Sequence, residues 1–272
     1  MKYIIFAAIL ICIYALYEFF EHKCILFNHY KIDLGLNLKV AVISDIHNKS
    51  FFKRVLTCIE KESPDYIFIP GDVPIKSTGH YKKGLKTLKT LSEIAPIFYS
   101  FGNHELSMRE RFPEEFKEYL RSLPKNVTLL NDSHIKLTDE AEIYGISLSR
   151  AVYKKGKFPD YKKFPKIYFA DMNSVGTNPS CEIPTRKILL AHNPDFYEYY
   201  ASIGNWDLII SGHNHGGVIR LPFTDGIIFP TFGVKHRTKG IYDKNHFVSV
   251  GAGEHLIPAR VFNRCSIDIL SL

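Results

Sequence analysis

Short apolar runs alternate with amphipathic segments along most of the chain. Apolar runs bounded by turn residues are typical of buried strands, and apolar residues that recur every three or four positions are typical of helices. Strands that alternate with helices predict βαβ units and a largely parallel sheet. Predicted strands cover 38–44, 66–69, 97–101, 127–130, 141–146, 187–191 and 207–211, and predicted helices cover 51–61, 81–94, 112–123 and 196–203.

Three regions depart from this alternation. Residues 24–37 are predicted to form a linker and an edge strand. Residues 151–185 are rich in Lys, Pro and aromatic residues without a clean period, which predicts an insertion or long loop, a feature that often serves as a lid or substrate surface. Residues 218–272 carry several short strand-like runs, which predict a second set of mostly antiparallel strands.

The N-terminal residues 3–20 are nearly all apolar and are interrupted only by Glu18. Eighteen helical residues rise about 27 Å, close to the hydrocarbon thickness of a bilayer. No small-x-small cleavage site follows the run, and no small residues precede Cys24 as they do in a lipoprotein signal. A buried helix of a soluble core would have a polar face. We therefore predict an uncleaved membrane anchor over residues 1–23 and one domain over residues 24–272.

Composition and charge narrow the class of protein. The chain has 272 residues, of which 46% are hydrophobic and 23% charged, which is ordinary for a globular domain. The net charge of +7 suits nucleic acid, anionic membranes or phosphorylated substrates. The basic residues form no stripe interleaved with aromatic residues, which argues against nucleic acid as a partner. The five cysteines form no CxxC pair, so the sequence indicates neither a zinc knuckle nor a disulfide framework.

Several predicted strands end in residue types that bind metal ions. The loop 212–217 places two histidines one residue apart, and its glycines permit the turn that brings both rings to one centre. Open α/β sheets collect ligands at the carboxyl ends of their strands, so these strand ends are expected to converge. The predicted metal ligands are Asp45, His47, Asp72, Asn103, His192, His213 and His215.

Seven ligands are too many for one ion. A mononuclear catalytic zinc ion takes three protein ligands and water, whereas a larger set with a shared carboxylate suits two ions about 3.5–4 Å apart. Ligation by imidazole, carboxylate and amide without thiolate favours Mn, Fe or Zn over Ca or Mg. We expect two divalent ions, with Mn as the first expectation and Fe or Zn as alternatives.

The order of these blocks resembles a known family. Asp45-Ile46-His47, Gly71-Asp72, Gly102-Asn103-His104-Glu105, His192 and Gly212-His213-Asn214-His215 resemble the five blocks of the calcineurin-like metallophosphoesterase superfamily. The resemblance implies a four-layer α/β/β/α sandwich of the metallophosphoesterase type, here preceded by one N-terminal transmembrane helix.

The resemblance also implies individual roles. His104 looks like the histidine that stabilises charge and protonates the leaving oxygen, and Glu105, where many members have Asp, would orient His104. The implied reaction is hydrolysis of a P–O bond by a metal-bridging hydroxide. By the same resemblance, one ion is held by Asp45, His47 and His215, the other by Asn103, His192 and His213, and Asp72 bridges the two.

The anchor and the motif 216–222 are similar to those of a bacterial, membrane-associated, YkuE-like subgroup, some relatives of which cleave the pyrophosphate of UDP-diacylglucosamine. The chain departs from this subgroup at Val218, where members usually have Gln, and at 263–265, where they tend to have Pro-Pro-Glu. The phosphoester substrate therefore stays open, with a lipid-linked one as one candidate. The resemblance implies a single-pass protein of the bacterial cell membrane, and the charge pattern at the anchor favours a domain outside the cytoplasm.

Two other functions compete with this one. The first is a non-catalytic scaffold that keeps the fold and the metal ions. The second is a nucleic-acid or nucleotide phosphodiesterase, which the positive charge permits but which lacks a base-reading motif. Hydrolysis of a phosphoester would separate the first alternative from the main hypothesis, and the preferred substrate would separate the second.

Overall fold

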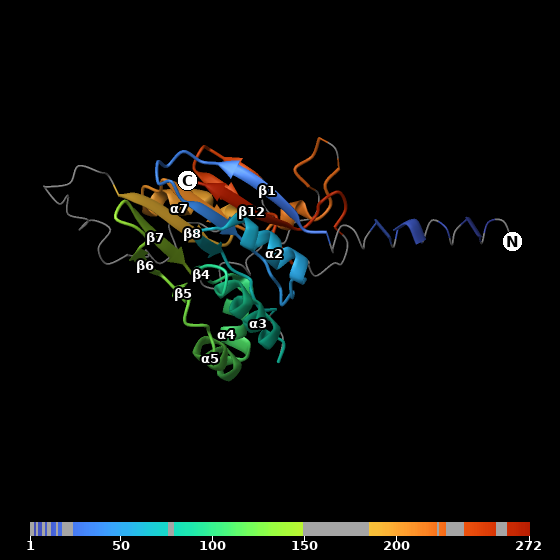
Figure 1. Cartoon of the computed structure of the whole chain (residues 1–272), viewed down its shortest axis with the longest axis horizontal. Coiled ribbons are helices and arrows are strands. Elements are labelled where there is room, and N and C mark those ends of the chain that lie inside the picture. The colour runs from blue at the N-terminus through green and yellow to red at the C-terminus, as the bar shows by residue number, and fades with distance from the viewer. Residues whose placement is uncertain are drawn as a thin grey trace, which may run out of the picture.

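Two mixed β-sheets form the body of the protein in a computed structural model (Figure 1). The structure describes residues 24–75, 79–148, 185–221, 223–226, 237–253 and 260–272, together with single positions between 3 and 17. Each sheet has six strands within these residues. The mixed α/β fold agrees with the prediction from the alternating pattern.

The first sheet has the strand order β1-β12-β2-β3-β4-β5. Strands β2 to β5 run parallel to one another, β12 is antiparallel to β2, and β1 is parallel to β12 at the edge. The edge strand predicted within residues 24–37 is therefore confirmed as β1. The bounds are β1 Leu26–Lys31, β2 Lys39–Val42, β3 Tyr66–Ile69, β4 Ile97–Ser100, β5 Val127–Leu130 and β12 Ser266–Ser271.

The second sheet has the strand order β10-β11-β9-β8-β7-β6. Strands β7, β8, β9 and β11 are parallel, and the two edge strands β6 and β10 are antiparallel to their neighbours. The bounds are β6 Ser133–Lys136, β7 Ala141–Ile146, β8 Arg186–Ala191, β9 Leu208–Ser211, β10 Gly240–Tyr242 and β11 His246–Val248.

Apolar contacts stack these elements in layers. One cluster joins the first sheet to helices α2, α3, α4 and α5, which Figure 1 shows below and in front of that sheet. A second cluster fills the space between the two sheets, and a third joins the second sheet to α7. The helix bounds are α2 Lys53–Glu62, α3 Tyr81–Ser92, α4 Asn103–Arg111, α5 Pro113–Arg121 and α7 Tyr197–Ile203, with short 3-10 turns η2 Pro194–Phe196 and η3 His215–Gly217.

The C-terminal region differs from the prediction. We expected a separate, mostly antiparallel set of strands after residue 218, but β11 pairs in parallel with β9 and β12 lies inside the first sheet. The apolar runs looked alike in sequence, and periodicity does not reveal which sheet a strand joins. Helix α4 was also missed, because its ligand-bearing start reads as a loop and its outer face is polar.

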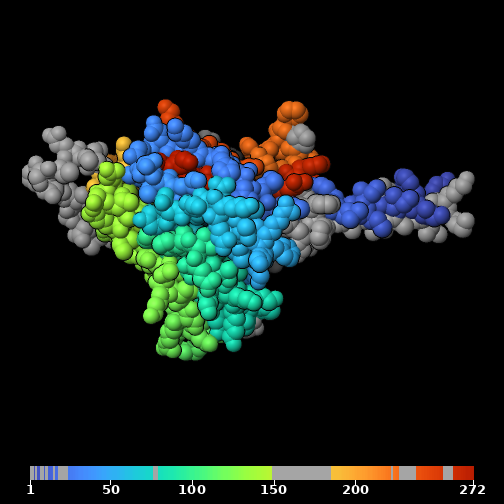
Figure 2. Space-filling view, in the orientation of Figure 1, coloured from blue at the N-terminus to red at the C-terminus, as the bar shows by residue number. Residues whose placement is uncertain are grey.

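Two predicted regions lie largely outside the described residues. Of the insertion predicted over 151–185, only the last residue is described, so that boundary stays a prediction. Figure 2 shows the described positions between 3 and 17 standing out from the body of the molecule. Within the described residues, no helix combines the length and the apolar character needed to cross a bilayer. The anchor over residues 1–23 therefore stays a prediction.

Candidate metal centre

The structure brings all seven predicted ligands together at the ends of five strands. The loops that carry them are also joined through the backbone. The Asp45 N–H donates to the carbonyl of Gly71 at 3.1 Å, and the Gly212 N–H donates to the carbonyl of His192 at 2.9 Å. These bonds tie neighbouring strand ends to each other within each sheet. The convergence follows from parallel strands that present their carboxyl ends at one edge.

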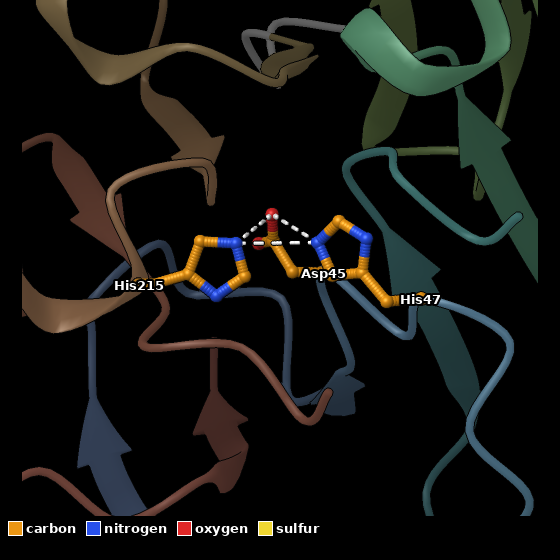
Figure 3. A group of neighbouring side chains, drawn as sticks. All are labelled: Asp45, His47 and His215. Atoms are coloured by element: carbon orange, nitrogen blue, oxygen red, sulfur yellow. Dashed lines mark hydrogen bonds and ion pairs between the residues drawn. The ribbon is translucent and has the colours of Figure 1, made fainter. Parts of the chain in front are cut away.

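Asp45, His47 and His215 form what we call the first ligand group. Figure 3 shows the two imidazoles pointing towards each other with the carboxylate beside them. The two Nε2 atoms are 3.2 Å apart, and Asp45 Oδ1 lies 3.8 Å from His47 Nε2 and 3.5 Å from His215 Nε2. All three side chains are almost completely buried. The group can therefore place two nitrogens and one oxygen around a single ion.

Asp72, Asn103, His192 and His213 form the second ligand group. His192 Nε2 lies 3.2 Å from Asp72 Oδ2 and 3.1 Å from Asn103 Oδ1. His213 Nδ1 lies 3.1 Å from the same His192 atom. Two imidazole nitrogens, one carboxylate oxygen and one amide oxygen therefore lie close enough together to bind a single ion.

Asp72 lies between the two groups. Its Oδ2 is 3.2 Å from His192 Nε2 in the second group and 4.0 Å from His47 Nε2 in the first. The same oxygen is 4.0 Å from Nε2 of His104, whose ring packs against that of His47 with centroids 4.7 Å apart. This position suits a carboxylate that bridges two ions, with His104 at the edge of the site.

The backbone at these positions is unusual. Five of the predicted ligands have a left-handed φ, between 46° and 68°, which only a few per cent of non-glycine residues adopt. Such strain concentrates at functional sites, where the surrounding structure holds it in place. The histidines of the loop therefore turn by their own conformation, and not only through the adjacent glycines. The five residues are Asp45, His47, Asp72, His213 and His215.

Gly212 and Gly102 allow neighbouring ligand loops to pack directly against the backbone. A Cβ atom at Gly212 would lie 1.8 Å from Ser44 Oγ, and one at Gly102 would lie 2.2 Å from Asp72 Oδ1. Neither glycine has a positive φ. We predicted that the glycines of the histidine loop permit its turn, but at Gly212 a glycine is needed because the neighbouring ligand loop occupies the space of a side chain.

Burial and mutual charge shift the pKa values of the ligands in the absence of ions. Burial alone would raise the pKa of Asp45 and of Asp72, but the nearby histidines hold both pKa values below their usual range. Burial opposes the charged form of His192, yet Asp72 raises its pKa to about 9. Burial and the charge of His192 lower the pKa of His213 to about 4. The carboxylates are thus kept ionised, as ligands must be.

Glu105 lies at the start of α4 with its carboxylate among backbone N–H groups, and its predicted role in orienting His104 stays a prediction. Its buried carboxylate accepts hydrogen bonds from the backbone N–H groups of Asp72 at 3.1 Å, Val73 at 2.7 Å and Gly102 at 2.9 Å, and from the hydroxyl of Tyr99. Burial and the charge of Asp72 raise its pKa to about 7. Glu105 therefore fixes the loop that presents Asp72.

The residues present fit two divalent ions by the chemistry of their donors. Imidazole nitrogens and carboxylate and amide oxygens converge in two adjacent groups, without thiolate. The Nδ1 of His192 donates to the carbonyl of Pro70 at 2.7 Å, so Nε2 is the nitrogen that a metal ion would take in place of the proton. The ligand assignments remain predictions, now with a consistent geometry.

Sequence reasoning missed the residues behind the first ligand group. Arg260 Nη2 lies 2.9 Å from His215 Nδ1, and the Asn263 amide donates to the backbone carbonyl of His215 at 2.6 Å. Asn263 stands where the YkuE-like pattern tends to have Pro-Pro-Glu. Neither residue is marked by periodicity or spacing in the sequence. Both follow β11 and precede β12, and they contact His215 only through the folded structure.

A family profile described as calcineurin-like phosphoesterase matches residues 38–217, which include all seven predicted ligands. An uncharacterised metallophosphoesterase of Campylobacter jejuni is 28% identical over 88% of this chain. The alignment covers 60% of that protein, so the chain spans less than two thirds of its length.

Two further relatives bear on the subgroup. The uncharacterised metallophosphoesterase YkuE of Bacillus subtilis is 26% identical, with 86% of this chain and 78% of YkuE covered. The UDP-2,3-diacylglucosamine pyrophosphatase LpxG of Chlamydia muridarum is 26% identical, with 68% of this chain and 66% of LpxG covered. The similarity to YkuE agrees with the resemblance drawn from the motifs.

Proposed function

Because the chain belongs to the calcineurin-like phosphoesterase family, we propose that it is a hydrolase that uses two divalent metal ions to cleave a P–O bond. The observation that carries this proposal is the position of Asp72, whose Oδ2 lies within 4.0 Å of ligand nitrogens from both groups. A single-ion site would not need a carboxylate between two sets of imidazoles. Two ions would activate a water molecule and neutralise the phosphate oxygens.

The side chains around the site supply orientation and a proton. The His104 N–H at the start of α4 donates to Asp72 Oδ1 at 2.8 Å, so the positive end of the helix stabilises this carboxylate. The His104 side chain is 17% exposed, which leaves the ring open to a substrate at the edge of the site. His104 can therefore hold a proton at Nε2 and pass it to the departing oxygen.

A lipid-linked pyrophosphate is our proposed substrate class. The similarity to LpxG, whose name identifies it as a UDP-2,3-diacylglucosamine pyrophosphatase, supports this choice. So does the contact of Tyr17, in the apolar N-terminal region, with Phe262, whose ring centroid lies 5.8 Å from that of Tyr17. Phe262 is 64% exposed, and the next residue, Asn263, donates to the carbonyl of His215 at 2.6 Å, so an exposed aromatic side chain is adjacent in sequence to a residue that contacts the ligand loop.

The test uses the full chain in detergent micelles. We expect elemental analysis to find two ions per chain, and Mn²⁺ to support hydrolysis of a nucleotide-linked pyrophosphate lipid more than of an aryl phosphomonoester or diester. Preference for a simple ester would contradict the lipid-linked substrate but keep the hydrolase. Two bound ions without hydrolysis of any of the three would favour the metal-binding scaffold instead.

We further propose that the N-terminal residues anchor the chain to a bacterial membrane, with the domain outside the cytoplasm. Described apolar positions in this region are exposed, among them Ile9 and Ile13. An Asp at the centre of a membrane helix costs about 2.5–3.5 kcal/mol. Replacing Ile9 and Ile13 together by Asp should leave most of the chain unbound in vesicle flotation, whereas Ile135→Asp, at an exposed Ile of β6, should float like the unaltered chain. Flotation of the double variant with the vesicles would contradict the anchor.

A further inference from the structure

Arg260 is a buried cation beside the first ligand group. It is the largest fully buried side chain among the described residues. Its Nη2 donates to the carbonyls of Gly253 at 2.8 Å and Val250 at 3.2 Å, and lies 2.9 Å from His215 Nδ1. Within the described part of the chain, none of its hydrogen-bond partners is a carboxylate. Burying a charge without a paired carboxylate costs free energy, and a metal ion bound next to this charge would be repelled by it.

The direction of the bond to His215 is unambiguous. A guanidinium carries only donors, so His215 Nδ1 accepts, and the hydrogen of the neutral ring sits on Nε2. That Nε2 is the atom that faces Asp45 and His47 in the first ligand group. A metal ion needs a lone pair at this atom. An ion that binds there must therefore move the hydrogen to Nδ1 and end the contact with Arg260.

The second ligand group has the opposite arrangement. His192 Nδ1 faces the carbonyl of Pro70 at 2.7 Å, and a carbonyl only accepts, so the ring hydrogen sits on Nδ1. Its Nε2 faces the oxygens of Asp72 and Asn103, and an ion that takes the place of the proton there leaves the bond at Nδ1 intact. A ligating histidine normally donates its other N–H in this way. An ion in the second group therefore keeps the hydrogen bond of His192 to Pro70, whereas an ion in the first group ends the contact between His215 and Arg260 and lies near a fixed cation.

We propose that the two ions bind with unequal affinity and that Arg260 weakens the ion of the first ligand group. The inference rests on the proposed two-metal function. Repulsion between the guanidinium and a divalent ion is little screened in buried surroundings. At low metal concentration the chain then carries one ion, in the second ligand group, and takes up the other only when metal is plentiful. Arg260 acts through His215 and is a positioning residue that need not touch the substrate.

The test is a Mn²⁺ titration of the full chain in detergent, followed by calorimetry and by the electron paramagnetic resonance of free Mn²⁺. We expect two Kd values that differ by about tenfold or more, a difference of about 1.4 kcal/mol. Arg260→Met should tighten the weaker Kd by about tenfold and leave the tighter one unchanged. Arg260→Lys keeps a cationic donor and should bind like the unaltered chain.

Arg237 provides a matched control. Its Nη1 lies 2.9 Å from Nδ1 of His246, a buried histidine outside both ligand groups, so Arg237→Met removes the same kind of contact elsewhere and should change neither Kd. His215→Ala should abolish the weaker ion and His192→Ala the tighter one. This pair tests the order of binding even where Arg260→Met does not fold.

The outcomes separate the inference from the function on which it rests. Fewer than two ions in the unaltered chain at saturating Mn²⁺ would overturn the two-metal proposal and the inference together. Two ions in the unaltered chain, with the weaker Kd unchanged or weakened further in folded Arg260→Met, would overturn the inference alone. Loss of the tighter ion in His215→Ala would overturn it as well.

Discussion

Asp72→Asn is expected to reduce phosphoester hydrolysis on the order of 1,000-fold and to weaken both ions. The substitution keeps the shape of the side chain but removes the charge that faces His192 at 3.2 Å and His47 at 4.0 Å. Metal ions contribute several kcal/mol to the stabilisation of the transition state, and each 1.4 kcal/mol corresponds to a factor of ten in rate. The measurement is kcat together with the metal content of the purified variant.

Asp132→Asn is the matched control for this variant. Asp132 also has a left-handed φ, of 51°, and its Oδ1 accepts a backbone hydrogen bond from Ser147, but it lies outside the ligand groups. Its variant should keep both ions and nearly full turnover. Near-normal turnover of Asp72→Asn with two ions retained would show that Asp72 does not bridge the ions.

The convergence of the site was predictable because it depends on sheet geometry. Once the runs before Asp45, Asp72 and Asn103 are read as parallel strands, their carboxyl ends must meet at one edge. The same argument brings in His192 and the histidine loop through β8 and β9, which pair in parallel. The α/β class followed from the alternation of strands and helices, whereas the four-layer sandwich was implied only by the family resemblance.

The remaining details depend on contacts between distant segments. The resemblance implied only that Glu105 orients His104, whereas the side chain at the third position of this helix also reaches back to N–H groups before the helix, where it accepts from Gly102 and the Asp72 loop. Arg260 reaches His215 over 45 residues of chain, and β12 enters the first sheet between β1 and β2. Spacing along a sequence carries no information about such long-range placement.

His104→Ala is expected to leave both ions in place and to slow hydrolysis more when the departing oxygen is a stronger base. The His104 ring lies at the edge of the site, with Nε2 4.0 Å from Asp72 Oδ2. General-acid catalysis contributes about 10²–10⁴-fold when the departing oxygen is a strong base. An aryl oxygen departs without a proton, so an activated aryl ester should lose far less.

The decisive quantity is therefore the ratio of the two losses, measured as kcat/KM for an alkyl and an aryl ester of the same phosphate. His29→Ala, at an exposed histidine of β1 that pairs with Glu62, should change neither rate. Equal slowing of both esters by His104→Ala, with metal content unchanged, would mean that His104 stabilises charge on the phosphate and does not donate the proton. A variant that loses an ion would instead make His104 part of the metal site, because its Nε2, His47 and Asp72 already form a group able to hold one.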